Sequence, residues 1–173
     1  MKTVVDRIQW TVNILEVAPT DLILEIGCGN GSAVSMISRS LKEGMITAID
    51  QSEKMVKIAK NKNAEHESVG KVKFLAANFQ EAELGQSHFN KIFAVNVNLF
   101  WMNPEHELKI IRDRLLPNGT LYLVNQPPNI DKIRLIEERT CHNLKNAGFQ
   151  IKQVLVGDQR PVPGICIIAY LEP

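Results

Sequence analysis

The sequence predicts an α/β fold, in which a doubly wound, mostly parallel sheet of seven strands has helices on both faces and a reversed strand near the C-terminus. Short apolar runs alternate with segments of helical periodicity along most of the chain. A glycine-rich segment, residues 27–31, directly follows the first apolar run, as it does at the ligand-binding turn of such sheets. The last two apolar runs, 149–156 and 165–170, are joined by a connection too short for a crossover helix, so we expect them to pair antiparallel.

The individual elements follow from periodicity and from helix and turn signals. Apolar residues recur at helical spacing over 3–17, with Pro19 just beyond, and 21–26 has the apolar character of a strand buried on both faces. Next we expect a helix from Ala33 to Leu41 closed by Gly44, a strand at 45–49, a helix at 52–65 starting at Ser52, and a strand at 72–76. The later elements are a strand at 92–97, a helix from Pro104 to Leu116 that Pro117, Asn118 and Gly119 terminate, a strand at 121–124, and a helix at 130–147 capped by Gly148.

Length and composition indicate one domain. In 173 residues a single core can bury about two-thirds of the unfolded chain's surface, so we expect a helix in residues 1–20 on a core of residues 21–173. The 20 basic and 19 acidic residues give a net charge of +1, which provides no overall attraction to nucleic acid. No long apolar stretch indicates secretion or membrane insertion, so a cytoplasmic location is expected. The cysteines and histidines show neither disulfide nor metal-ligand spacing, and no metal site is expected.

The turn in LEIGCGNG is the strongest candidate for a ligand site. Glycines at 27, 29 and 31 let a ligand approach the backbone closely, and the helix that follows offers free N–H groups. A dinucleotide-binding turn would have its third glycine where Ser32 stands, and no Lys-Ser/Thr pair follows Gly31 as in a phosphate-binding P-loop. Asp50 ends the second expected strand, where a carboxylate can accept both hydroxyls of an adenosine ribose; capping the next helix is its alternative role, for which Ser52 is equally available.

At these residues the chain resembles the class I S-adenosylmethionine-dependent methyltransferases, and the resemblance extends over roughly residues 8–171. It is carried by the order and spacing of LEIGCGNG, AIDQSEKMV, LAANFQE, FNKIFAVNVNLFW, PNGTLYLVNQPP and the closing strand pair. The resemblance implies transfer of a methyl group from S-adenosyl-L-methionine, which leaves S-adenosyl-L-homocysteine as product.

The resemblance also implies a set of cofactor-binding residues. Glu25 and the backbone of the glycine turn would hold the methionine part, and Asp50 the ribose. Asn78 stands where the family commonly has an aspartate that accepts the adenine amino group, and its side-chain carbonyl can accept the same bond. Phe79 would cover the adenine face or belong to the core. The full set is Glu25, Gly27, Cys28, Gly29, Gly31, Asp50, Gln51, Met55, Asn78, Phe79, Asn96 and Val97.

The acceptor side is less defined. A sulfonium methyl group is already activated, so donor and acceptor mainly need to be held close and aligned. The sequence does not indicate whether a catalytic base is used. Candidate acceptor-side groups follow the fourth and fifth strands: Asn96, Asn98, Trp101 and Gln126. A core position for Trp101, and loop-stabilising roles for Asn98 and Gln126, remain alternatives.

The acceptor class follows from what the sequence lacks. Residues 96–99 read Asn-Val-Asn-Leu instead of the Asn-Pro-Pro-Tyr of adenine-methylating enzymes, so DNA is not expected as a substrate. With a net charge near zero, a small molecule is the preferred acceptor. Methylation of RNA or protein with a partner subunit, and a catalytically silent S-adenosylmethionine-binding module, are the alternatives. The sequence carries no indication of oligomeric state.

Overall fold

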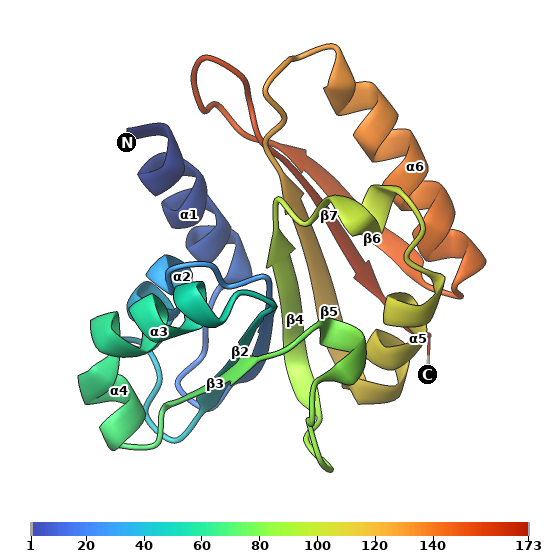
Figure 1. The fold of residues 1–173 in the computed structure, drawn as a ribbon. Coiled ribbons are helices and arrows are strands. Elements are labelled where there is room, and N and C mark those ends of the chain that lie inside the picture. The colour runs from blue at the N-terminus through green and yellow to red at the C-terminus, as the bar shows by residue number, and fades with distance from the viewer. Residues whose placement is uncertain (1, 173) are drawn as a thin grey trace.

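The computed structural model describes residues 2–172, and in this range the chain forms one seven-stranded sheet of order β3-β2-β1-β4-β5-β7-β6 (Figure 1). Only β7 runs antiparallel to its neighbours, β5 and β6, which confirms the predicted mostly parallel sheet with a reversed strand. The elements in chain order are α1 (Lys2–Leu15), β1 (Leu22–Ile26), α2 (Ser32–Ile37), β2 (Met45–Asp50), α3 (Glu53–Lys62), α4 (Ala64–Ser68), β3 (Val72–Ala76), η1 (Phe79–Glu81), β4 (Phe89–Val95), η2 (Asn98–Trp101), α5 (Glu105–Arg114), β5 (Leu115–Asn125), α6 (Lys132–Asn146), β6 (Gln150–Val156) and β7 (Ile165–Tyr170).

Two hydrophobic clusters, one on each face of the sheet, hold the helices in place. Alternate strand residues point to opposite faces, so Ile23 packs with side chains of α1, α2 and α3, whereas Leu24 packs with side chains of α5 and α6. Both residues are fully buried. Figure 1 shows the same division, with α1, α2 and α3 on one side and α5 and α6 on the other. Helices thus cover both faces, as predicted, and the open edge for a ligand is the carboxyl end of the strands.

The strand β5 begins earlier than predicted. Leu115 already pairs with Phe89, and regular pairing resumes only at Thr120 with Lys91. The residues between them, 116–119, form an irregularity because Pro117 has no N–H to donate and Asn118 adopts a positive φ of 64°. The turn signals at 117–119 therefore mark a bulge within a strand and not a loop before one.

Two helices also differ from the prediction. The helix expected at 52–65 is divided at Asn63, whose buried amide donates to the backbone oxygens of Gly31 and Ala59. The helix expected to reach Leu41 ends at Ile37, and the chain then turns so that the N–H groups of residues 42–44 all reach the Pro19 oxygen. In both places side-chain or backbone partners outside the helix replace the bonds that would have continued it.

Among the described helices, every one is either too short or too polar to cross a membrane.

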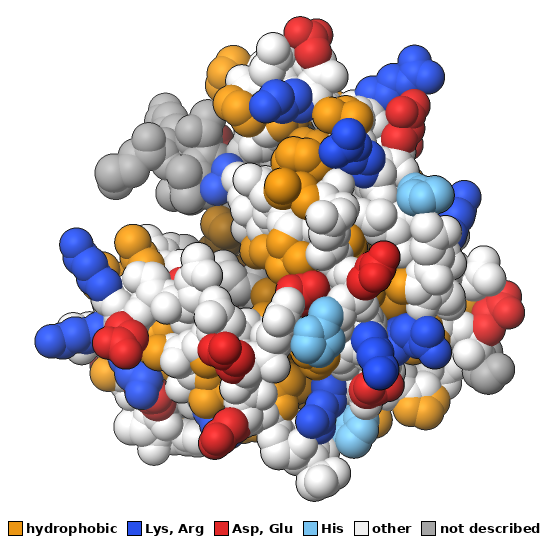
Figure 2. Space-filling model, turned by 45° about the vertical axis from the view of Figure 1, so that its right-hand side comes forward, with side chains coloured by type: hydrophobic (Ala, Val, Ile, Leu, Met, Phe, Trp, Pro, Cys, Tyr) orange, Lys and Arg blue, Asp and Glu red, His pale blue; other side chains and the backbone are white. Residues whose placement is uncertain are grey.

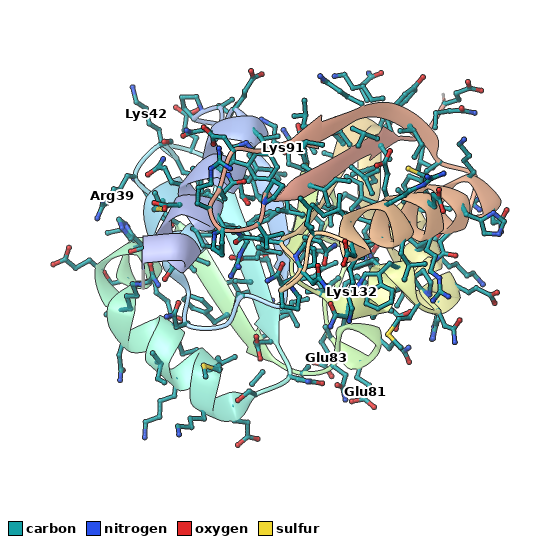
Figure 3. All side chains as sticks on the ribbon, turned by 90° about the horizontal axis from the view of Figure 1, so that it is seen from above. Arg39, Lys42, Glu81, Glu83, Lys91 and Lys132 are labelled. Atoms are coloured by element: carbon teal, nitrogen blue, oxygen red, sulfur yellow. The ribbon has the colours of Figure 1, made fainter. Side chains whose placement is uncertain are left out.

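At the amino ends of β1 and β4 the buried carboxylate of Asp21 accepts from Lys91 Nζ at 2.6 Å and from the Asn90 amide. Figure 3 labels Lys91, which also donates to the Glu16 oxygen. These bonds fix β1 against β4, the two strands whose carboxyl ends flank the candidate site.

Candidate functional site

A cavity of about 680 Å³ opens at the carboxyl ends of β1–β4. This volume lies within the range of about 300–1,000 Å³ that is usual for sites of small ligands and cofactors. The cavity is lined by Ile26, Gly27, Ile49, Asp50, Gln51, Ala77, Asn78, Phe79, Gln80, Glu81, Val95, Asn96, Val97, Asn98, Leu99 and Glu107. The structure therefore brings most of the residues singled out from the sequence to one place.

Of the glycine turn, residues 27–31, only Gly27 lines this cavity. Gly27 has a φ of 77°, and a Cβ atom there would lie 2.7 Å from Val97 Cγ2. The N–H groups of Gly27 and Cys28 both donate to the Ile49 oxygen, at 2.8 and 2.9 Å, and so join the turn to β2. Gly29 also has a positive φ, 51°, but a Cβ atom there would meet nothing within 4 Å. The turn thus needs glycine at 27 for packing, and at 29 it leaves open space beside the backbone.

Two further residues of the turn, Gly31 and Cys28, pack against the rest of the fold. A Cβ atom on Gly31 would lie 2.9 Å from Ala59 Cβ, so this glycine lets the start of α2 pack against α3. The Cys28 side chain is buried in the core, and burial raises the pKa of its thiol well above the usual range. Neither residue lines the cavity, so what they contribute is the shape of the turn.

Asp50 connects the end of β2 to the glycine turn. Its Oδ2 accepts a hydrogen bond from Gly29 N at 2.8 Å, and its Oδ1 accepts from Ser52 N at 2.9 Å. The helix α3 is capped by Ser52, whose Oγ accepts from Met55 N at 3.3 Å. Because Ser52 does the capping, the carboxylate of Asp50 keeps lone pairs free on the cavity side.

Glu25 of β1 stands two positions before Gly27, does not line the cavity and is only 2% exposed. Its Oε2 is buried and has no hydrogen-bond partner among the described residues. Burial, and then the negative charge of Asp50, raise the pKa of Glu25 to about 8 from an ordinary value of 4.5. A positively charged ligand group nearby would favour ionisation of this carboxyl group.

The charged residues that line the cavity are all acidic. They are Asp50, Glu81 and Glu107, and the cavity lining contains no lysine or arginine. Glu81 lies with Glu83 at the edge of the molecule seen in Figure 3. Such a site repels phosphate groups and attracts cations, which suits the sulfonium and ammonium charges of S-adenosylmethionine and disfavours phosphorylated nucleotides.

Three polar residues of the cavity, Gln80, Glu81 and Glu107, are not among the residues singled out from the sequence. Gln80 Nε2 donates to Glu107 Oε1 at 2.5 Å, which joins η1 to α5. Glu107 is 7% exposed although it is acidic. It stands four positions before the buried Ile111, on the same face of α5, and this spacing was the available signal that its carboxyl group points inward.

Gln126 occupies the acceptor side without lining the cavity itself. Its backbone N–H donates to Asn96 Oδ1 at 2.8 Å, and Asn96, with a positive φ of 56°, does line the cavity. Its side-chain Oε1 accepts from Arg7 Nη1 at 3.1 Å, and its Nε2 donates to the Val162 oxygen at 2.7 Å. Gln126 thus joins the ends of β4 and β5 to α1 and to the β6–β7 connection, residues 157–164.

Of three further residues singled out from the sequence, Trp101 and Met55 do not line the cavity, whereas Phe79 does. Trp101 lines a separate hollow beside α6, and its Nε1 donates to Asn98 Oδ1 at 3.3 Å. Met55 is 38% exposed on α3 and does not line the cavity. Phe79 lines the cavity and also packs in the core cluster of α5 and α6, so both of its expected roles have a place.

Comparison with known proteins agrees with this geometry. The chain matches the methyltransferase domain family over residues 23–119. Over 165 residues it is 27% identical to the uncharacterized methyltransferase YdaC of Bacillus subtilis (strain 168), covering 93% of this chain and 89% of that protein. Its fold is similar to that of a SAM-dependent methyltransferase from Aquifex aeolicus (TM-score 0.75, 19% identity, 93% and 88% of the two chains covered). A similar structure from Geobacter sulfurreducens, a SAM-dependent methyltransferase in complex with S-adenosyl-L-homocysteine, has a TM-score of 0.71 at 13% identity and covers 96% and 91%. The chain therefore belongs to the methyltransferase domain family and is a class I S-adenosylmethionine-dependent methyltransferase.

Proposed function

We propose that this methyltransferase acts on a small-molecule acceptor, which binds at the carboxyl ends of β4 and β5 beside a cofactor held in the acidic cavity. The observation that carries the placement of the cofactor is the lining itself: three carboxylates and no basic residue, next to an open backbone at Gly29. A ligand that carries positive charges and no phosphate group matches this lining.

The cofactor is proposed to extend from the glycine turn to the segment after β3. The methionine part lies against residues 27–29, above the unpartnered carboxyl oxygen of Glu25. The free lone pairs of Asp50 accept the ribose hydroxyls, and Gln51 lines the cavity beside them. At the adenine end, Phe79 offers an aromatic face, while Asn78 and Glu107 offer oxygen atoms to the adenine amino group.

The residues of the chain then act by positioning and not by acid–base chemistry. When bound, S-adenosylmethionine supplies a methyl group on a positive sulfur; its C–S bond breaks with the electron pair left on sulfur, as an acceptor lone pair forms the new bond to carbon. Asn96 and Val97, after the end of β4, line the cavity together with Gly27, which supports the proposal that they lie beside the sulfur. Their role is to align the acceptor and to exclude water from the reacting atoms.

A small-molecule acceptor is supported by the surface. On the face shown in Figure 2, lysine and arginine side chains alternate with acidic ones and with apolar patches, without a continuous basic area. Binding of RNA relies on clustered positive charge, which this face does not offer. The net charge of +1 agrees with this preference.

The test is methyl transfer from labelled S-adenosylmethionine to fractions of a cell extract. We expect label in the dialysable small-molecule fraction, resistant to nuclease and protease. Label in RNA or in protein would instead support a macromolecular acceptor, and for RNA the transfer should weaken steeply with salt. Binding of S-adenosylhomocysteine without transfer to any fraction would support a silent binding module.

A further inference from the structure

Arg7 of α1 is a half-buried cation whose only described partner is neutral. Its Nη1 donates to Gln126 Oε1 at 3.1 Å, while its buried Nε has no partner among the described residues. Burial lowers the pKa of this guanidinium, and none of the ion pairs in the described part of the chain includes it. A desolvated charge with one neutral hydrogen bond is poorly compensated, so this position favours an anion.

The position of Arg7 relates it to the acceptor side of the enzyme. The chain Arg7–Gln126–Asn96 consists of two hydrogen bonds and ends at a residue that lines the cofactor cavity. One turn further along α1, Trp10 packs against Gly164, where a Cβ atom would lie 2.9 Å from its ring. Figure 1 shows α1 and the β6–β7 connection side by side above the sheet. Arg7 therefore lies beside the end of β5, where α1 and the β6–β7 connection both contact Gln126.

The donors available there match a planar anion with a single charge. The two Nη groups of Arg7 lie in one plane, and the described hydrogen bonds of this guanidinium use only Nη1, so Nη1 and Nη2 can together donate two parallel hydrogen bonds to a carboxylate. Gln126 Nε2 uses one of its two hydrogens on the Val162 oxygen, which leaves one more donor beside the guanidinium. Arg7 supplies one positive charge, and Gln126, Val162 and Trp10 add none, so a carboxylate is matched better than a phosphate dianion.

We propose that Arg7 and Gln126 bind a carboxylate of the methyl acceptor, so that the substrate is a small carboxylic acid. The inference rests on the proposed small-molecule function, because it assigns a chemical class to that acceptor. A carboxylate paired with a guanidinium is a poorer nucleophile, so the methyl group would be transferred to another atom of the acceptor.

The experiment uses the full chain saturated with S-adenosylhomocysteine and follows the Arg7 Nε–Hε signal by ¹⁵N NMR, assigned by its loss in Arg7→Lys. The probes are phenylacetate and its neutral amide, phenylacetamide, with inorganic phosphate as a third ligand. We expect phenylacetate to shift this signal saturably, phenylacetamide to leave it unchanged, and phosphate to bind more weakly. By calorimetry, Arg7→Gln should weaken phenylacetate binding by about tenfold or more, and Arg7→Lys should weaken it less, because it keeps the charge but loses the planar fork.

The matched control is Arg39→Gln, which removes a charge from an exposed position at the edge of the molecule in Figure 3 and should leave phenylacetate binding unchanged. Equal shifts with the acid and the amide, no shift with either, or tighter binding of phosphate would overturn the proposal. Binding of S-adenosylhomocysteine is measured in the same samples and should be the same in Arg7→Gln as in the unmodified chain. Absence of S-adenosylhomocysteine binding in the unmodified chain would count against the cofactor site. The phenylacetate titration is therefore also run without S-adenosylhomocysteine, so that the Arg7 result can be judged separately.

Discussion

Asp50 Oδ2 accepts a 2.8 Å hydrogen bond from the backbone N–H of Gly29, which links the end of β2 to the turn after β1. The residue proposed to bind the ribose therefore also shapes the loop proposed to bind the methionine part. A substitution at Asp50 acts on both, so its effect on affinity has to be separated from its effect on stability.

Asp50→Ala should weaken binding of S-adenosylhomocysteine by about tenfold or more, because charged hydrogen bonds to the ribose are lost. Calorimetric titration measures the affinity, and thermal melting measures the stability. The control is Ser52→Ala, which removes the cap of α3 and should cost about 1 kcal/mol of stability without changing the affinity. Unchanged affinity in Asp50→Ala would show that Asp50 does not bind the ribose.

Gly29→Ala and Gly70→Ala form a matched pair. Both glycines have a positive φ, 51° and 76°, and at both a Cβ atom meets nothing within 4 Å. Each substitution should cost about 1–2 kcal/mol in unfolding free energy because alanine is strained in this conformation. Only Gly29→Ala should also weaken binding of S-adenosylhomocysteine, since Gly29 belongs to the turn proposed to bind the methionine part, whereas Gly70 lies between α4 and β3. Equal affinities in the two variants would show that the ligand does not approach Gly29.

Glu25→Gln should change the pH dependence of stability. The pKa of Glu25 is raised to about 8, so the native state keeps a proton that the unfolded state releases above 4.5. The stability from this group is therefore fully present below about pH 4.5 and is lost as the pH rises through 8. Glutamine stays neutral, so the melting temperature of the variant relative to the parent should rise between about pH 5 and about pH 9. Glu43→Gln, at an exposed position, should show no such trend, and a flat difference for Glu25→Gln would contradict the raised pKa.

Glu107→Gln should weaken binding of S-adenosylhomocysteine several-fold, because a carboxylate oxygen in the cavity is replaced by a weaker neutral acceptor or by a donor. Glu105→Gln removes the same charge from the exposed side of the same helix and should leave the affinity unchanged. The comparison is made by calorimetry in parallel. If both variants lose affinity equally, the effect comes from the overall charge of α5 and not from contact with the ligand.

The donor side was predictable because its determinants are local. The glycine turn and Asp50 each stand at the end of an apolar run, and the parallel register of β1 and β2 brings them together. The acceptor side was less predictable because its contacts join distant segments. Arg7 and Gln126 are 119 positions apart and meet because α1, which packs against α2 and β4, brings Arg7 to the end of β5. Glu107 was missed for a different reason, since an acidic residue on an amphipathic helix is normally exposed.

The strand β7 lies between β5 and β6, and this position determines how β6 is joined to the rest of the sheet. In the described sheet β6 pairs only with β7, so β6 is joined to the rest of the sheet only when β7 docks on β5. The connection at 157–164, which provides the Val162 oxygen for Gln126, is completed by that docking. The cofactor cavity, in contrast, is lined only by residues up to Glu107. Local opening of the β6–β7 hairpin would thus disturb the contact between Val162 and Gln126 on the acceptor side, while the cofactor cavity stays intact. Amide hydrogen exchange can measure the opening of these two regions separately.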